Sequence, residues 1–157
     1  MQFINVEYNA PKEKVLEMLK DNERVNKNVR FDNDGVKPLM KIKDKGNGRI
    51  KINCEMIGGP TKDNGFLVGT YFSGRMKEKD GVTRLKGTIT TAPLYHLFLI
   101  ALIAVFIVQC FRVKGISFIP PILVVFDIFM FKNEFKKQGY IKRYLYRAER
   151  RLSDEQR

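Results

Sequence analysis

The stretch RIKINCEMI, residues 49–57, decides the fold class of this chain. Apolar and polar side chains alternate along it, and one face would carry Ile50, Ile52, Cys54 and Met56. A period of two predicts a β-strand that is buried on one face. Glycine-rich turns flank the stretch at 44–48 and 58–60, so we expect it to pair with antiparallel neighbours.

Further alternating runs surround this strand. The run before it turns Met40 and Ile42 inward. After it, residues 66–77 and 82–91 alternate again, and the Asp80-Gly81 step between them predicts a tight hairpin. The inward side chains expected in these two strands are Phe66, Val68, Phe72, Met76, Leu85 and Ile89. These runs form a four-strand meander, to which residues 3–8 add a first strand.

A change to helical spacing follows the first strand. Pro11 is suited to the first turn of a helix, and Val15, Met18 and Leu19 then fall on one face. The spacing predicts a helix over 12–20, followed by a short second helix that carries Val25 and Val29. The expected fold class is α+β: an antiparallel meander sheet with N-terminal helices and a long C-terminal helix.

Two apolar blocks interrupt this α+β pattern. Residues 92–111 carry no formal charge, and their length matches the roughly 20 residues that cross a bilayer core of about 30 Å. Residues 115–131 form a second block, which contains Pro120, Pro121 and Asp127. The link between the blocks is three residues long, so they would run antiparallel as a transmembrane helical hairpin.

Flanking charges would orient this hairpin. The link holds two cations, Arg112 and Lys114, whereas Lys and Arg are abundant on both outer sides. The positive-inside rule then predicts a multi-pass protein of the cell membrane with two spans and with both termini in the cytoplasm. His96 and Asp127 would lie at similar depth as an intramembrane polar pair, or each would be hydrated near the headgroups.

The segment after the blocks, residues 132–157, is basic and amphipathic. Its apolar stripe, which we expect to pack back on the sheet, comprises Phe135, Ile141, Tyr144, Leu145, Ala148 and Leu152. Basic residues next to a membrane attract anionic headgroups. The candidate anionic-lipid contacts are Lys132, Lys136, Lys137, Lys142, Arg143 and Arg147. The expected organisation is therefore a cytoplasmic α+β part over 1–91, a hairpin over 92–131 and the terminal helix over 132–157.

Residues 6–21, VEYNAPKEKVLEMLKD, resemble the opening of START-like, or helix-grip, domains of the polyketide-cyclase group. In that group a first strand ends in an Ala-Pro step, and a helix follows with Val at the position of Val15. The resemblance implies that the sheet grips the terminal helix and that a hydrophobic ligand is held between them. The run FSGRM at 72–76, followed by a strand and two hydrophobic segments, also looks like small uncharacterised bacterial membrane proteins.

These features favour a membrane-anchored binding or interaction module that holds a lipid or another hydrophobic ligand. The alternative is an accessory or scaffold subunit of another membrane protein. An enzyme is less favoured, because the chain has one His and two distant cysteines, Cys54 and Cys110, and lacks metal-ligand spacing and a phosphate-binding loop. No cofactor, metal or nucleic-acid partner is expected, although the net charge is +12, because the basic residues form no known nucleic-acid motif.

Overall fold

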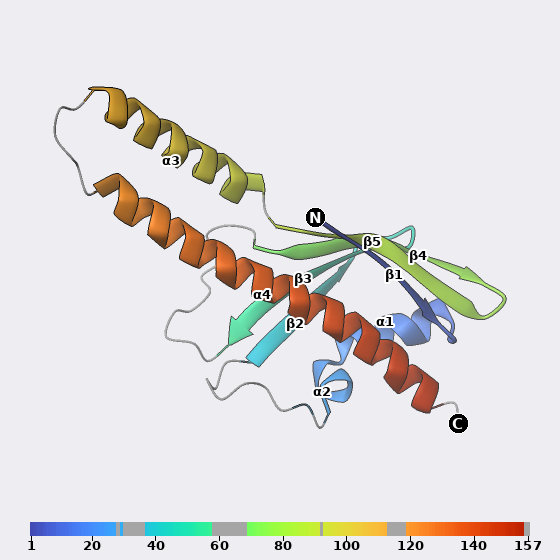
Figure 1. Ribbon diagram of the computed structural model, residues 1–157. Coiled ribbons are helices and arrows are strands. Elements are labelled where there is room, and N and C mark those ends of the chain that lie inside the picture. The colour runs from blue at the N-terminus through green and yellow to red at the C-terminus, as the bar shows by residue number, and fades with distance from the viewer. Residues whose placement is uncertain (28, 30–36, 58–68, 92, 113–118, 156–157) are drawn as a thin grey trace.

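The computed structural model describes residues 1–27, 29, 37–57, 69–91, 93–112 and 119–155, and for Lys37, Ile57 and parts of the last two ranges it describes the backbone alone. Within these ranges one antiparallel sheet is covered on a single face by helices (Figure 1). The α+β class and the meander are therefore confirmed.

Five strands make up the sheet, in the spatial order β1-β5-β4-β3-β2. Their bounds are β1 Gln2–Tyr8, β2 Lys37–Asp44, β3 Arg49–Ile57, β4 Tyr71–Lys79 and β5 Val82–Thr90. Every neighbouring pair is antiparallel. The strand predicted over 49–57 is confirmed to the residue, whereas β4 begins at Tyr71, and the predicted inward residues Phe66 and Val68 lie outside the described residues.

The hairpin between β4 and β5 shows why this sequence turns where it does. Lys79 pairs with Val82, which leaves a two-residue loop of Asp80 and Gly81. Both loop residues have positive φ, at 55° and 74°. A loop of this kind has the twist that antiparallel strands need, and Asp-Gly adopts it at low cost.

Four helices accompany the sheet: α1 Lys12–Lys20, α2 Asn22–Val25, α3 Pro93–Arg112 and α4 Ile119–Asp154. The prediction for 12–20 is confirmed, and Val15, Met18 and Leu19 are buried as expected. The second helix ends at Val25, so Val29 lies outside it. Asp21 separates the two helices, since its Oδ1 accepts a hydrogen bond from the Arg24 amide at 2.9 Å and so caps α2.

Helix α4 crosses the inner face of the sheet and closes the core (Figure 1). Its buried stripe comprises Ile141, Tyr144, Leu145, Ala148 and Leu152. These side chains pack in one cluster with the inward residues of the strands, and the predicted return of the terminal helix to the sheet is confirmed. Phe135 is an exception, because it is 55% exposed where the stripe had predicted burial.

The prediction of a multi-pass protein with two membrane spans is wrong. In the described part of the chain, no helix combines the length and the apolar character that crossing a bilayer requires. The second apolar block does not form a helix of its own, because α4 runs without a break from Ile119 through the charged segment to Asp154.

Candidate interaction surfaces

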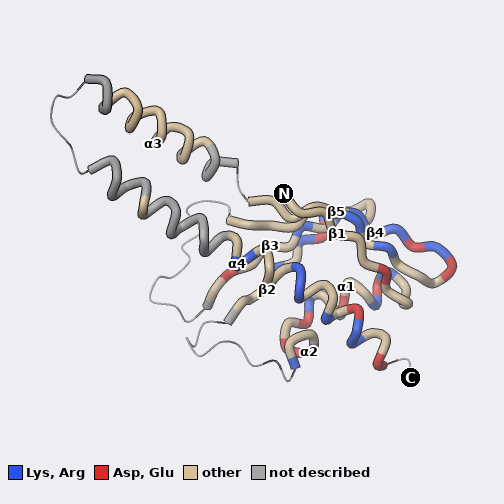
Figure 2. Tube along the Cα trace, in the orientation of Figure 1, with Lys and Arg blue, Asp and Glu red and all other residues tan. Residues whose placement is uncertain are grey.

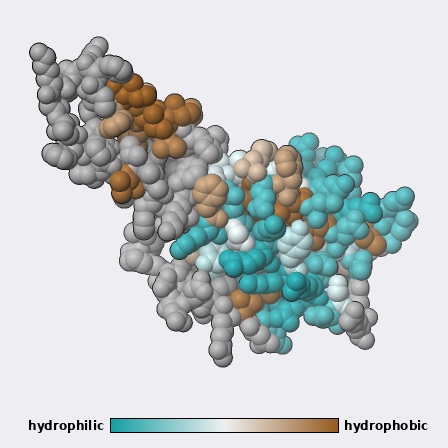
Figure 3. All heavy atoms as spheres, viewed as in Figure 1, coloured by the Kyte–Doolittle hydropathy of each residue, from teal (hydrophilic) through white to brown (hydrophobic). Residues whose placement is uncertain are grey.

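Helix α3 exposes large apolar side chains on most of its circumference. Leu97 and Ile100 are 62% and 63% exposed. The other exposed members are Ile103, Val105, Phe106, Ile107 and Val108. At 100° per residue these seven positions surround the helix rather than forming one stripe. We call these seven residues the apolar surface of α3; it is the brown area on the projecting part in Figure 3.

The arrangement of the helices explains this exposure. Helix α3 lies beside the N-terminal part of α4, and both project beyond the sheet (Figure 1). Leu99 and Leu102 are half-buried, whereas all seven residues of the apolar surface of α3 are exposed. Covering a half-exposed side chain of this size is worth about 1 kcal/mol, so a partner that covered all seven would gain several kcal/mol.

A buried polar contact holds the base of this projection. Gln138 of α4 donates from Nε2 to Oγ1 of Thr91 at 2.8 Å, and both side chains are buried. Thr91 directly follows β5 and lies two residues before α3 begins. The contact therefore ties the start of the projecting part to the helix that spans the core.

The cations that the sequence proposed as lipid contacts do not share one open surface. Lys136 and Arg143 are exposed, and Lys142 is half-buried. Lys137 is buried, at 7% exposure. Arg147 donates from Nη1 to Oδ1 of Asn26 at 3.1 Å, and burial, together with the charge of Arg143, lowers its pKa. The side chain of Lys132 lies outside the described part of the chain.

The side chains of the proposed polar pair, His96 and Asp127, also lie outside the described part of the chain. His96 lies in α3 and Asp127 lies in α4, but the structure describes neither side chain. Their pairing stays a prediction.

Two buried tyrosines place their hydroxyls against backbone carbonyls of other elements. Tyr8 donates to the Leu145 carbonyl at 3.2 Å, and Tyr144 donates to the Leu19 carbonyl at 2.7 Å. Burial is the main cause that raises the pKa of both phenols, and the charge of Glu149 adds to the effect at Tyr8. A phenol in this setting keeps its proton, so these groups join the core rather than transfer protons.

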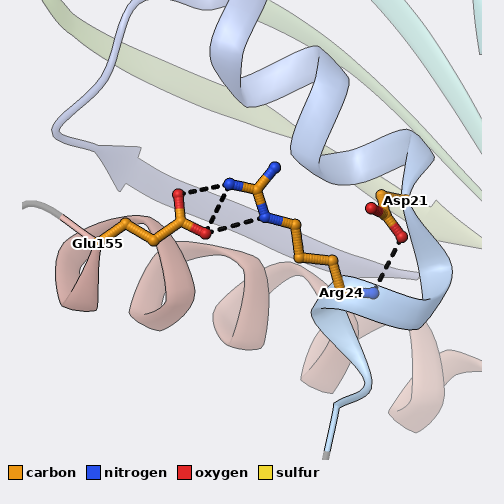
Figure 4. Close-up of polar contacts among 3 residues, drawn as sticks. All are labelled: Asp21, Arg24 and Glu155. Atoms are coloured by element: carbon orange, nitrogen blue, oxygen red, sulfur yellow. Dashed lines mark hydrogen bonds and ion pairs between the residues drawn. The ribbon is translucent and has the colours of Figure 1, made fainter.

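A surface ion pair fixes the end of α4. Arg24 donates from Nε to Glu155 Oε1 at 2.9 Å and from Nη2 to Oε2 at 2.7 Å (Figure 4). The bidentate geometry holds the residue after α4 against α2. In the same view Asp21 caps the helix that presents Arg24.

The described residues do not form a metal centre. Within the described ranges, no three His, Cys, Asp or Glu side chains lie close enough together to hold a metal ion. The thiol of Cys54 is buried on the inward face of β3.

The outer face of the sheet holds a set of cations that sequence reasoning missed. In the described part of the chain the helices lie over the inner face, and Figure 2 shows Lys and Arg along the strands (Figures 1 and 2). The described outward cations of β2 to β5 are exposed, except Lys51, which is half-buried. Seven of them form what we call the basic band: Lys43, Arg49, Lys51, Arg75, Lys77, Arg84 and Lys86. The alternation of each strand did show these cations, but the register that joins them is a property of the sheet.

Comparison of the chain with protein-family models, with curated proteins and with solved structures finds no match to any of them.

Proposed function

We propose that the chain is a binding module whose α+β body presents helix α3 to an apolar partner. The observation that carries the proposal is the apolar surface of α3, which covers most of the helix circumference. An isolated helix that is apolar on all sides is not stable in water without cover. A patch of this kind on a folded protein marks a place where another molecule binds.

The body is suited to such a role because buried contacts attach it to both projecting helices. The Gln138–Thr91 contact anchors the base, and the buried stripe of α4 anchors the other half of the projection. The proposed arrangement is a reduced helix-grip fold in which α4 is the gripped helix. What supports it is the order of elements, with helices after the first strand and a terminal helix across the sheet.

The proposed ligand has the chemistry of acyl chains. A lipid or another hydrophobic molecule of this kind can surround a helix on several sides, as the distribution of exposed residues requires. A protein partner that met α3 on one side would leave the remaining apolar residues in water.

The test compares two variants of the full chain, purified in a neutral detergent. Ile100→Gln with Val108→Gln removes two members of the apolar surface, and Phe3→Gln is the control because Phe3 is an 80% exposed apolar residue on β1. We expect native mass spectrometry to show bound lipid on the wild type and on the Phe3→Gln chain, and less on the α3 variant. Equal lipid loads on all three chains would refute the proposal.

A second candidate function is that of a scaffold subunit, and one observation favours it. Val125 and Phe135 of α4 are 67% and 55% exposed, so exposed apolar residues occur along both projecting helices. A pair of helices is a suitable surface for the helices of another protein. Photo-crosslinking from position 100 in cells would capture that protein, and the absence of a crosslinked protein would exclude the scaffold.

A further inference from the structure

The outer face of the sheet brings cations into direct opposition across neighbouring strands. The register pairs Lys43 with Lys51 between β2 and β3, and Arg49 with Arg75 between β3 and β4. Between β4 and β5 it pairs Arg75 with Lys86 and Lys77 with Arg84. The four pairs form a diagonal band that crosses four strands.

Few carboxylates balance this band. Arg84 contacts Glu7 Oε1 at 2.8 Å, and no other member has an ion pair to a carboxylate within the described ranges. A second acid on this face, Glu55, pairs with Lys41 at 2.8 Å, outside the band. Both carboxylates thus lie at the margins of the band and leave its centre, Arg49, Arg75 and Lys86, uncompensated.

The opposed charges act against folding. Like charges that face each other across two strands destabilise a sheet. Threonine pairs or pairs of opposite charge at these positions would stabilise it. Six of the seven side chains are exposed, and the core does not need any of them, because the inward residues alone form the hydrophobic cluster. Opposed cations that lower the stability of the sheet and contribute nothing to the core are a candidate binding site.

We propose that the basic band binds the phosphate backbone of a nucleic acid, without sequence preference. The inference does not depend on α3 or on its partner. It also departs from the sequence-based expectation that the chain has no nucleic-acid partner. That expectation depended on the absence of a known motif, whereas the band is formed by the register of the strands.

The chemistry of the band selects this partner over other polyanions. Protein partners are held by apolar or aromatic anchors inside the interface, and lipid surfaces by apolar side chains that enter the bilayer. The outward side chains between these cations are polar, namely Ser73, Asn53 and Thr88, and the ring of Tyr71 lies against the Lys51 ammonium. Interfaces with nucleic acid are more polar and far more positive, and Lys and Arg on phosphates supply most of the non-specific affinity.

The contact of Tyr71, an aromatic residue beside the band, supports recognition of the backbone rather than of bases. Lys51 places its ammonium 4.0 Å from the centre of the Tyr71 ring. That face of the ring is therefore occupied by a cation and is not open to a stacked base.

The experiment uses the full chain in a neutral detergent and two labelled duplexes of unrelated sequence, each about 20 bp long, which spans more than the band. Fluorescence anisotropy is measured between about 50 and 200 mM salt, the range over which phosphate contacts weaken strongly. The variant Arg75→Gln with Lys86→Gln removes the centre of the band. Lys14→Gln with Arg150→Gln is the control, because it removes the same charge from exposed positions on α1 and α4.

We expect both duplexes to bind the wild type equally, with an affinity that falls linearly on a log–log plot against salt. The band variant should reduce the slope of that plot by about 2, or about 1 for each lost phosphate contact, while the control keeps the slope. Both variants should remain folded by circular dichroism. Equal losses in the two variants would show a net-charge effect and overturn the proposal, as would binding to vesicles of anionic lipid without binding to either duplex.

Discussion

At the scale of single residues, the two buried tyrosines hold α4 to the rest of the core. The Tyr144 hydroxyl donates a hydrogen bond to the Leu19 carbonyl near the end of α1. Tyr144→Phe removes the donor and should lower the free energy of unfolding by about 1 kcal/mol in urea denaturation. Tyr146→Phe is the matched control, because Tyr146 is exposed and its change should have no measurable effect.

The same phenols predict how stability depends on pH. Burial raises the pKa of Tyr8 and Tyr144 in the folded chain, whereas an unfolded chain would ionise them near pH 10. Above that pH the unfolded state binds fewer protons than the folded state, so stability falls as pH rises. Urea midpoints measured between pH 8 and about pH 11 should decline, and the Tyr144→Phe chain should decline less steeply. A flat profile would contradict the burial of both phenols.

At the scale of elements, the pairing of β4 and β5 depends on two glycines that face each other. Gly74 and Gly87 are register partners on the inward face, and the Phe72 side chain packs over them. A Cβ on Gly87 would lie 2.5 Å from Gly74 Cα and 2.6 Å from Phe72 Cζ. Backbone atoms cannot move away as a flexible side chain can, so the two strands approach closely only because both positions lack a Cβ.

Gly87→Ala should therefore destabilise the fold by about 1–3 kcal/mol, the usual cost of overpacking, with a matching loss in thermal unfolding temperature. Gly139→Ala provides the control within α4, where the nearest side-chain atom to a new Cβ, Arg143 Nη2, is 4.0 Å away. Alanine has a higher helix propensity than glycine, so the free energy of unfolding of this variant should rise by up to about 1 kcal/mol. An unchanged thermal unfolding temperature in Gly87→Ala would show that the two strands can move apart without loss of stability.

At the scale of the whole molecule, charge predicts a response to salt. The chain carries a net charge of +12, and its sheet opposes cations in four cross-strand pairs. Salt screens repulsion between exposed charges more than it affects the core. The thermal unfolding temperature of the full chain in detergent should therefore rise from about 20 mM to about 300 mM salt, and rise less in the Arg75→Gln, Lys86→Gln variant. A decrease with salt would mean that attractive pairs dominate.

The whole molecule also shows where a sequence pattern misleads. Residues 92–111 and 115–131 are apolar, and the first of them nearly coincides with α3. Periodicity could not show where along α4 the buried stripe begins, or that Phe135 lies on the exposed side before the helix reaches the core. These depend on where α4 meets the sheet.

Local patterns in the sequence were sufficient for the elements of the body. The alternation at 49–57, the Asp80-Gly81 turn and the helical spacing at 12–20 each depend on neighbouring residues, and a strand, a turn or a short helix forms from such local preferences. The buried stripe of the terminal helix was predictable for the same reason. Tertiary structure alone decided which residues meet: the phenols with carbonyls more than 100 residues away, Gly74 with Gly87, and the cations of the basic band with one another. Strand order and register join distant segments, and no periodicity within one segment contains that information.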